Sequence, residues 1–531
     1  MQECRNAGIE RRVKFFRKYH KWFSLVATIF ILFFAVSGII LNHRELLSGV
    51  DLSRKLLPPG YRYNNWNLAA IKGSLELNPD SMLIYGNIGI WITDHTFSKY
   101  HDFNRGFPDG IDNRKISSIA FVHGAELFAG SLFGLYHFRG DHWEKVSLPV
   151  EESRVVKVIS KGDSLLVMTR SHLLVSTSRS HFSEFREIHV PQGNDSDGKV
   201  GLFRTFWVIH SGEIYGVAGK LIVDAVGIIF IILCITGLVY FFVPYRLRRI
   251  KDPLRKSRLK KFNRTNLKWH NVVGSWAIVL LLLNTTMGMF LRPPLLIPIA
   301  NSRVSKIKFT KLDSPNPWSD RFRDLLYDDS LHRYLLATSE GIYYSDDEFR
   351  SELHPFTVQP PVSVMGITVF EKQSPGKYLV GSFSGIFEWN PASGLITDYI
   401  TKLEYVNSGR SGPPFGSVSV AGYMKSGSAS ELIFDYSNGV FPLAGGNPLP
   451  PIPREIISKS PISLWNACLE IHTGRIFEPI LGPFYILIVP LVGLATIIIL
   501  ISGFFAWWLA KRKMENRNWK KDIGISYRQV I

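Results

Sequence analysis

Four long stretches of apolar residues stand out along the chain, each bounded by polar or charged residues. They comprise residues 22–41, 225–243, 272–291 and 479–509, and none contains Asp, Glu, Lys or Arg. A membrane-spanning helix needs about 20 mostly apolar residues, so the pattern predicts four transmembrane helices. The last stretch is longer than one span requires, and Pro483 and Pro490 are expected to kink its first half or break it from an interfacial piece.

Positive charge is concentrated beside these stretches. Residues 1–21 hold seven Lys and Arg against two acids, residues 244–268 eleven against one, and residues 509–521 six against one. These segments together carry more positive charge than the net +18 of the whole chain, so the remainder is near neutral. Basic residues flanking apolar spans follow the positive-inside rule, which places both termini and the central basic loop in the cytoplasm and argues against a nucleic-acid partner.

The resulting organisation alternates spans with two large outer loops. We expect a cytoplasmic basic N-terminus (1–21), transmembrane helix 1 (22–43), the first half of an outer β domain (44–205), a His-Ser-Gly segment with transmembrane helix 2 (206–243), a cytoplasmic basic loop (244–269), transmembrane helix 3 (270–292), the second half of the outer domain (293–464), a His-Thr-Gly segment with transmembrane helix 4 (465–509) and a cytoplasmic basic C-terminus (510–531). In a bacterium this is a multi-pass protein of the inner membrane with periplasmic or extracellular loops.

Both outer loops show short alternating apolar runs separated by turn residues, which predicts all-β structure. A unit of strand, small polar turn and Gly-apolar-aromatic recurs in residues 87–91, 132–138, 339–345, 383–389 and 437–443, with a weaker copy at 171–177 that has His172 in the glycine position. The spacing matches β-propeller blades, and three units fall in each loop. Since three blades do not close a ring, we expect one composite propeller of about six or seven blades from both loops, with two separate β-sandwiches as the alternative.

The two halves of the chain resemble each other. His20 and His270 open spans one and three, and each is followed 18 residues later by a glycine, Gly38 or Gly288. VIHSGEIYG precedes span two and EIHTGRIF precedes span four, and those spans contain VGIIFIILCITG and VGLATIIILISG. Tandem repeats that run in the same direction imply a pseudo-twofold axis along the membrane normal.

These motifs resemble the PepSY-associated transmembrane family: a basic cluster before YHKW in span one, the HSG and HTG pairs, and ITG and ISG within spans two and four. The resemblance covers the four spans and their edges, while the small PepSY module is not visible in either loop. Similar members include bacterial inner-membrane reductases of ferric siderophores that bind b-type haem through histidines, and others have no assigned role. The resemblance therefore implies haem b, electron transfer and iron chemistry.

Histidines beside membrane spans are costly unless they have a task. Repeat symmetry would bring His20 and His270 together on the inner side, and His210 and His472 together on the outer side, as two bis-histidine haem sites with glycines beside the porphyrin edges. His43 has no counterpart and is either a ligand of an asymmetric outer site or an interfacial anchor. The alternative for all five histidines is anchoring beside aromatic residues, and for the glycines it is tight helix packing.

Other polar residues near the spans have simpler interpretations. Lys220 and Asp224 are spaced to form an ion pair on span two, although Asp224 could serve a proton relay or contact a haem propionate. Ser211-Gly212 and Thr473-Gly474 could begin helices with hydroxyl caps. On the predicted topology Cys4, Cys234 and Cys468 lie in three different compartments, so no intrachain disulfide is expected.

The outer loops carry further histidines without a recurring metal spacing: His95, His101, His123, His137 and His142. We expect these to be surface or blade residues, although His137 and His142 with Asp141 could bind a metal. Walker A, GxGxxG, GxSxG, HExxH and CxxC motifs do not occur, which leaves soluble hydrolase or nucleotide chemistry without support.

The sequence thus predicts a membrane electron carrier that binds one or two b-type haems. It would take electrons from a cytoplasmic donor or a quinone and reduce a substrate such as a ferric chelate at the outer face. The alternatives are a non-enzymatic membrane-anchored propeller that binds or senses a partner, and an accessory subunit of a transporter.

Overall fold

A computed structural model describes residues 2–528 except 123–125, 196, 364–365, 406–415, 427–429 and 444–448. The chain forms two compact units. The helical unit comprises Met1–Arg44, Gly198–Asp313 and Trp465–Ile531, and the β unit comprises Glu45–Asp197 and Ser314–Leu464. His123 lies outside the described residues. The two loops between the predicted spans therefore fold together as one unit.

The helical unit holds four helices long and apolar enough to cross a membrane, as the sequence predicted. Its elements are α1 (Gln2–Asn42), α2 (Leu202–Ser211), α3 (Gly216–Arg249), α4 (Pro253–Met289), α6 (Leu464–His472), α7 (Glu478–Leu481) and α8 (Ile488–Arg528), with short strands β14 (Lys199–Gly201) and β15 (Arg303–Ser305) and 3-10 turns η5 (Glu213–Tyr215), η6 (Ile297–Ile299), η7 (Lys311–Asp313), η8 (Arg475–Phe477) and η9 (Gly482–Leu487).

The basic segments continue the apolar helices. Helix α4 begins at Pro253, well before the apolar stretch, where the side chain of Asp252 accepts a hydrogen bond from the backbone N–H of Leu254. Lys and Arg favour helix, and Asp at the N-cap with Pro at the first helical position is a strong start signal. The last stretch is broken at Pro483, which lies in η9 between α7 and α8, whereas Pro490 lies in the first turn of α8, which begins at Ile488.

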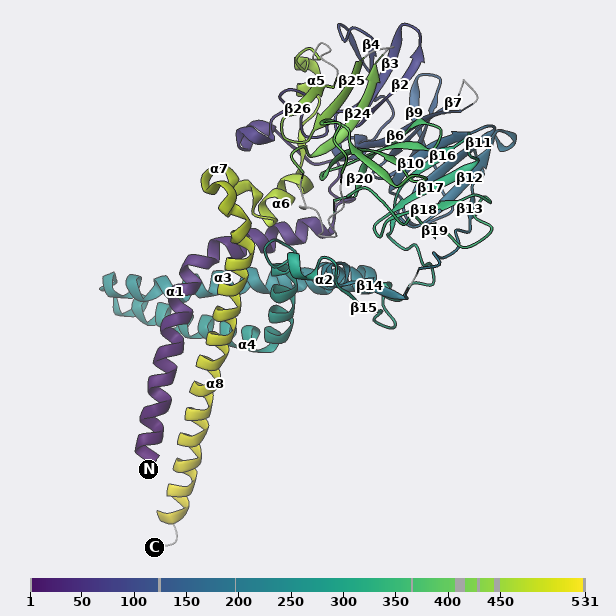
Figure 1. The fold of residues 1–531 in the computed structure, drawn as a ribbon. Helices are drawn as coiled ribbons and strands as arrows, with labels where there is room; N and C mark the ends of the chain where they lie inside the picture. Colours follow the sequence, from purple (N-terminus) through teal and green to yellow (C-terminus); the bar gives the residue numbers. More distant parts are fainter. Residues whose placement is uncertain are drawn as a thin grey trace. The chain divides into compact units, whose positions relative to one another are not determined.

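The four long helices pack in the order that the repeat requires. Helix α1 packs against α3 and α8, and α4 packs against the same two helices (Figure 1). Two apolar clusters fill the middle: Ala27, Ile31, Cys234 and Ile499 in one, and Val226, Ala277, Leu281 and Leu500 in the other. Ala27 and Ile31 stand seven and eleven residues after His20, and Ala277 and Leu281 stand at the same distances after His270. The core therefore repeats with the sequence.

The β unit consists mainly of small antiparallel sheets whose strands follow one another in sequence order, which confirms the all-β prediction. The first loop forms sheets β2–β5 (Gly73–Asn78, Ser81–Gly86, Gly89–Asp94, Tyr100–Asp102), β6–β9 (Ile116–Val122, Glu126–Ser131, Gly134–Arg139, His142–Val146) and β10–β13 (Val155–Lys161, Ser164–Thr169, Leu173–Thr177, Arg186–Ile188).

The second loop forms sheets β16–β19 (Phe322–Asp328, Arg333–Thr338, Ile342–Ser345, His354–Pro355), β20–β23 (Ile367–Ser374, Lys377–Ser382, Gly385–Asn390, Leu395–Asp398) and β24–β26 (Val420–Ser426, Ser430–Asp435, Gly439–Pro442). β1 (Asp51–Leu52) pairs with β27 (Ile462–Ser463). The short helices are α5 (Arg454–Ser458), η1 (Arg54–Leu56), η2 (Pro59–Tyr61), η3 (Ile111–Arg114) and η4 (Ser178–Ser180).

Successive sheets share apolar cores. The first strands contact one another in the order β2, β6, β10, β16, β20 and β24, and β24 contacts β2 again. A separate buried cluster joins each neighbouring pair of sheets, including the pair formed by β24–β26 and β2–β5, where Met424 and Phe434 pack with Met82 and Trp91. Burial between sheets, rather than within any one sheet, therefore holds this unit together.

The recurring glycine unit has a fixed structural place. In each of the six copies it spans the turn between the second and third strands of a sheet. Gly89 and Gly439 have φ values of 87° and 85°, a backbone conformation that glycine adopts readily. In the weaker copy, His172 donates its backbone N–H to the Thr169 hydroxyl, which stabilises the turn without a glycine.

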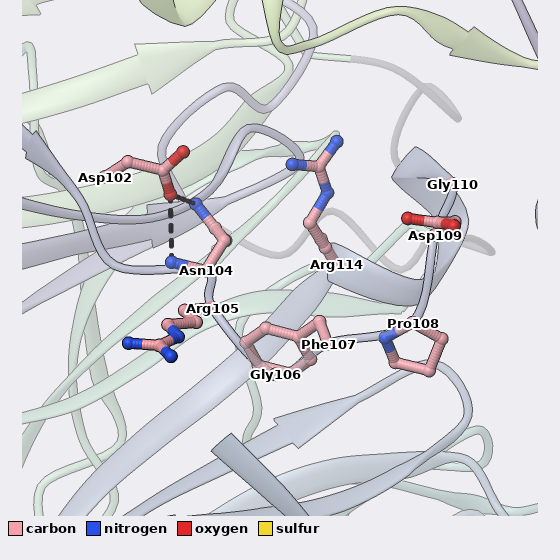
Figure 2. A pocket seen from close by; sticks show the side chains of 9 residues that line it. All are labelled: Asp102, Asn104, Arg105, Gly106, Phe107, Pro108, Asp109, Gly110 and Arg114. Carbon is pink, nitrogen blue, oxygen red and sulfur yellow. Dashed lines mark hydrogen bonds between the residues drawn. The ribbon is translucent and has the colours of Figure 1, made fainter. Parts of the chain in front are cut away.

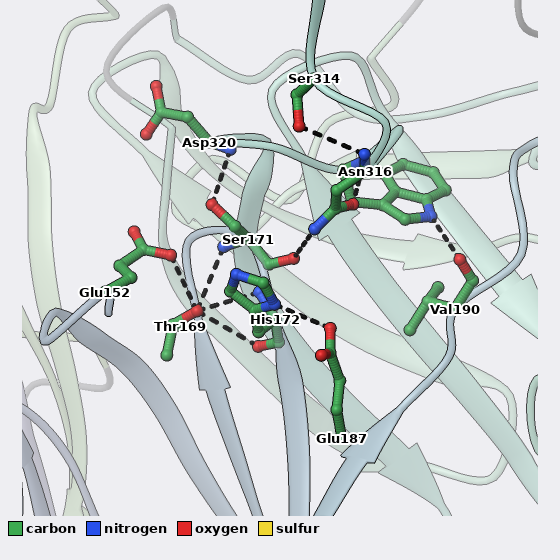
Figure 3. A network of polar contacts seen from close by, with 10 residues as sticks. Glu152, Thr169, Ser171, His172, Glu187, Val190, Ser314, Asn316 and Asp320 are labelled. Atoms are coloured by element: carbon green, nitrogen blue, oxygen red, sulfur yellow. Dashed lines mark hydrogen bonds and ion pairs between the residues drawn. The ribbon is translucent and has the colours of Figure 1, made fainter. Parts of the chain in front are cut away.

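A polar network joins the two loops where the third sheet meets the fourth (Figure 3). The amide of Asn316 donates to the carbonyl of Ser171 at 2.8 Å, and the N–H of Asp320 donates to the Ser171 hydroxyl at 3.0 Å. Arg170 pairs with Asp320, with 2.5 Å between Nε and Oδ1. His172 bonds to Glu187 at 2.7 Å within the third sheet. These bonds fix the junction between the halves of the chain.

Asp328 ties the fourth sheet to the fifth and gives a pH-dependent prediction. Its carboxylate lies 2.8 Å from the Lys372 ammonium and accepts bonds from Tyr378 and Gly376. Burial alone would raise the pKa of Asp328, but these bonds lower it to about 2. A lowered folded pKa stabilises the protein above the unfolded pKa of about 4, and the stabilisation is lost as pH falls from about 4 to 2.

Asp328→Asn should therefore lower the free energy of unfolding at pH 7 by about 1–3 kcal/mol, because it leaves buried donors and Lys372 poorly satisfied. The melting temperature of the detergent-solubilised full-length protein measures this, and the difference from the unaltered protein should shrink as pH approaches 2. Asp329→Asn is the matched control, since Asp329 is 79% exposed yet pairs with the same lysine. An equal loss in both variants would contradict the role of Asp328.

Candidate functional site

Two of the histidines predicted as ligands meet near the basic ends of the helices. His20 on α1 and His270 on α4 have ring centroids 6.1 Å apart, with the rings inclined at 75°. We call them the basic-end pair. The helices that carry them, α1 and α4, are repeat equivalents that both pack against α3 and α8. The prediction that symmetry brings these two histidines to one point thus agrees with their placement.

The other two repeat-related histidines meet at the opposite ends of the spans. His210 is the penultimate residue of α2 and His472 is the last residue of α6, and their ring centroids are 5.9 Å apart with an interplanar angle of 43°. We call them the loop-end pair. Gly38 lies beside His472 and 18 residues after His20, so the two pairs are separated by about 27 Å along α1 at 1.5 Å per residue.

The His-Ser-Gly and His-Thr-Gly motifs position the loop-end pair by ending α2 and α6. The first motif also begins a helix, as the sequence analysis suggested, because the Ser211 hydroxyl accepts a hydrogen bond from the N–H of Glu213 at the start of η5. Gly212 and Gly474 follow α2 and α6 with φ values of 80° and 76°. Glycine in this left-handed conformation is the usual residue after the last turn of a helix. The chain then turns into the next span, which leaves the preceding histidine at the helix end.

Each of the four histidines has its Nδ1 atom held in an equivalent way. Nδ1 of His20 bonds to the carbonyl of Ile499 at 2.9 Å, Nδ1 of His210 to that of Asn284 at 3.0 Å, and Nδ1 of His472 to that of Phe34 at 3.0 Å. Each carbonyl belongs to the residue four positions before a glycine of the repeat. The same stretch of helix therefore supplies both the carbonyl that accepts from Nδ1 and, four residues later, the glycine that leaves space beside the ring.

His270 bonds to the backbone of Leu233, four residues before Gly237, and also to a hydroxyl. Its Nδ1 lies 2.8 Å from the hydroxyl of Thr236, which itself donates to the carbonyl of Ile232 at 2.6 Å. The Thr236 oxygen therefore accepts from the histidine. Ser37 lies 3.0 Å from Nδ1 of His472 in a comparable position directly before Gly38.

These bonds determine which nitrogen is left for chemistry. A carbonyl oxygen can only accept, so Nδ1 must carry the proton, and the Nε2 atom of a neutral ring then has a free lone pair. Within the described residues, no hydrogen bond to Nε2 of these four histidines is found. Metal-binding histidines typically donate their second N–H to a backbone carbonyl in this way.

Glycines lie against all four rings. A Cβ added at Gly288 would lie 2.5 Å from His210, at Gly503 2.8 Å from His20, at Gly38 3.1 Å from His472 and at Gly237 3.5 Å from His270. The sequence analysis expected glycines of the repeat, here Gly38, Gly288, Gly237 and Gly503, beside porphyrin edges or in tight helix packing, and the structure places them against the histidine rings. Each ring is packed against a helix from the opposite repeat, with little room for a side chain at three of the four positions.

The spacing within each pair suits one metal ion bound by both rings. Imidazole nitrogens bind metals at about 2 Å, and each ring radius adds about 1 Å, so the centroids of two axial rings would stand about 6 Å apart. The observed 6.1 and 5.9 Å agree with this value. No cluster of three or more His, Cys, Asp and Glu side chains is found among the described residues, so two-histidine sites are the metal candidates there.

His43 belongs to neither pair. Its Nε2 lies 2.8 Å from Oδ2 of Asp224, and the side-chain amide of Asn42 donates to Oδ1 at 2.8 Å. The predicted pairing of Lys220 with Asp224 is wrong, because Lys220 instead lies 3.4 Å from Glu213. Asp224 is 7% exposed, and the end of α1 provides it with two closer partners.

The β unit offers weaker candidates. An open pocket is lined by Asp102, Asn104, Arg105, Gly106, Phe107, Pro108, Asp109, Gly110 and Arg114 (Figure 2). Asp102 is fully engaged by Asn104 and Lys459, and Arg114 donates to the Lys459 carbonyl at 3.0 Å. Of the candidate metal set, His137 bonds to Glu126 and His142 to Asp141. None of these groups points to a reaction.

The sequence analysis missed the partners of the histidines. The carbonyls of Ile499, Asn284 and Phe34 leave no trace in the sequence, because any residue supplies a carbonyl. Thr236 and Ser37 did leave one, since a hydroxyl residue directly precedes the glycine at both positions. A hydroxyl residue directly before a glycine of the repeat would have marked them.

Comparison with known families identifies the chain. The model of the PepSY-associated TM region matches residues 5–243 and again residues 170–511. The chain therefore belongs to this family of membrane proteins. No curated protein sequence matches it.

Solved structures resemble the chain only distantly. The extracellular domain of BT4673 from B. thetaiotaomicron is 8% identical with a TM-score of 0.35, over 70% of this chain and 32% of that one. YCF48 bound to D1 peptide is 9% identical with a TM-score of 0.29, over 74% and 98%. The chain spans about a third of the length of BT4673.

Proposed function

We propose that this protein carries electrons across a membrane through two b-type haems, one held by His20 and His270 and the other by His210 and His472. The observation that carries the proposal is the placement of four repeat-related histidines in two pairs. Their ring centroids are about 6 Å apart, and each Nδ1 has an acceptor. Bound haem would supply a one-electron Fe³⁺/Fe²⁺ couple at each site.

The residues of the chain have distinct tasks in this proposal. The four histidines present Nε2 in the tautomer that binds iron, and the carbonyls of Ile499, Asn284 and Phe34 hold the rings in place. The glycines let the helices approach the rings closely. The apolar clusters around Ala27 and Ala277 exclude water between the two sites. An electron would enter at one site and pass to the other, which lies about 27 Å away along α1.

The charges support an orientation of the protein in the membrane, on which the proposed direction of transfer rests. The basic segments lie at one end of all four spans, and the positive-inside rule places that end in the cytoplasm of a bacterium, with the protein in the inner membrane. Both loops that form the β unit leave the helices at the other end, so we place that unit outside. A cytoplasmic donor or a quinone would then reduce the basic-end site, and a substrate would be reduced at the loop-end site.

We further propose that the β unit is one six-bladed propeller built from both loops. The cyclic contact order of the first strands, including β24 with β2, supports ring closure. Closure protects sheet edges that three blades alone would leave open. The propeller would present the substrate, for which a ferric chelate is our candidate. Each ferric ion would accept one electron and become ferrous, and the donor would lose one electron.

Purified protein from haem-replete cells tests the redox proposal. We expect a reduced-minus-oxidised spectrum typical of b-type haem and two haems per chain by pyridine haemochrome assay. Protein reconstituted in vesicles should pass electrons from a reductant on the basic side to a ferric chelate on the other side. Colourless protein would refute the proposal and favour a membrane-anchored binding module.

A further inference from the structure

The two repeats are equivalent in their histidines but not in the charge around the loop-end pair. Asn42 and Arg292 occupy equivalent positions, each 22 residues after the first histidine of its repeat. Asn42 donates to Asp224, whose carboxylate also bonds to His43. In the first repeat, the end of α1 therefore lies beside a carboxylate, Asp224, that already has two partners, and we call this the acidic corner. The equivalent segment of the second repeat, at Arg292, has different neighbours, and we call it the arginine corner.

Arg292 lies in a group with an excess of positive charge. Its ionisable neighbours include Arg475, Glu470 and Tyr485, with a hydrogen bond to the Tyr485 side chain. Glu470 is 8% exposed and forms an ion pair with Arg475. The Nε atom of Arg292 is buried and has no hydrogen-bond partner within the described part of the chain. Arg292 therefore has a second guanidinium and one carboxylate within electrostatic range, and that carboxylate is already paired with Arg475.

A partly buried guanidinium whose positive charge is not balanced by a nearby negative charge is unfavourable unless an anion binds to it. Arginine is suited to such a role because its planar group donates two parallel hydrogen bonds to a carboxylate. The burial of Arg292 and its unused Nε therefore indicate a site prepared for an anionic ligand with carboxylate-like geometry.

This corner adjoins the loop-end pair. Arg292 lies four residues after Gly288, which lies against the His210 ring, and three residues beyond the end of α4. Arg475 follows His472 by three residues, through the left-handed Gly474. Both arginines are therefore close in the chain to residues of the loop-end pair. An anion bound there would lie close to anything held between His210 and His472.

We infer that Arg292 and Arg475 form a carboxylate-binding site that holds the propionate groups of the haem at the loop-end pair. The inference rests on the proposed function, since it assigns that haem an orientation with its acidic edge toward the arginine corner. The carboxylate of Asp224 would repel the same groups. Two equivalent histidines alone would accept the haem in either of two orientations, and this difference in charge between the repeats selects one of them.

The test compares haem b with its dimethyl ester, which keeps the iron and macrocycle but lacks the propionate charges. Full-length His270→Ala protein in detergent, depleted of haem, presents only the loop-end pair. We expect it to bind haem b about tenfold or more tightly than the ester in absorbance titrations, a typical value for charge-assisted hydrogen bonds. Arg292→Gln should remove most of this preference by weakening haem b binding alone.

Arg255→Gln is the matched control, since Arg255 lies near the start of α4, the helix that precedes Arg292, and its side chain is 82% exposed. Equal affinity for haem b and the ester in protein with Arg292 intact would overturn the inference and leave the haem proposal standing. Equal weakening of both ligands by Arg292→Gln would also overturn it, as expected if Arg292 binds a lipid headgroup or supports packing. Failure of both compounds to bind would refute the proposed function itself.

Discussion

Replacing His472 with alanine should reduce the b-type haem content of the purified protein from the proposed two per chain to one. The ring centroids of His472 and His210 are 5.9 Å apart, and Nδ1 of His472 bonds to the carbonyl of Phe34, which is the geometry on which the proposed loop-end site rests. Loss of one axial ligand should weaken that site by more than about 100-fold, because loss of an outer-shell partner alone costs about 10–100-fold.

The basic-end site should persist in this variant. It shares no ligand with the loop-end site, and about 27 Å of helix separates them. His270→Ala should produce the complementary loss, and the double variant should be colourless. The measurement is the haem-to-protein ratio by pyridine haemochrome assay, with the reduced-minus-oxidised spectrum of each single variant reporting the remaining haem.

His43→Ala is the matched control, because His43 lies near the same end of the spans but bonds to Asp224. It should retain two haems. A His472→Ala protein that keeps both haems, or a His43→Ala protein that loses one, would show that the loop-end site has been assigned to the wrong histidines.

The repeat is the reason that the sequence was informative about the site. A single histidine beside a span can be an anchor, but His20 with His270 and His210 with His472 occupy matched positions, and a twofold axis brings matched positions together. His43 lacks a counterpart, and the structure places it with a carboxylate. Symmetry thus separated the paired histidines from the unpaired one without any local ligand motif.

Other features could not be read from the sequence. The sequence analysis used the basic segments only for topology and did not predict their helical form, although the helix propensity of Lys and Arg and the Asp252-Pro253 start signal indicated it. The contact of β24 with β2 depends on packing between residues more than 300 positions apart, such as Met82 and Phe434, which no local pattern encodes. The turns between second and third strands were visible because glycine marks them.

Gly503→Ala should weaken haem binding at the basic-end pair at least severalfold, whereas Gly237→Ala should leave it nearly unchanged. Both glycines contact that pair from equivalent positions. A Cβ at position 503 would lie 2.8 Å from Cε1 and 2.9 Å from Nδ1 of His20, but a Cβ at position 237 would lie 3.5 Å from Cε1 of His270. The first distance forces the ring to move, and the second is ordinary van der Waals contact.

The two substitutions otherwise have similar effects. Alanine favours helix over glycine by about 1 kcal/mol at either position, so helix propensity does not distinguish them. Displacing His20 would stretch its 2.9 Å bond to Ile499, which holds the ring and fixes its tautomer. Haem titration of each variant in the His472→Ala background isolates the basic-end site, and melting temperatures check folding. Equal haem affinity in the two variants would mean that the close approach of Gly503 to His20 has no part in holding the ligand.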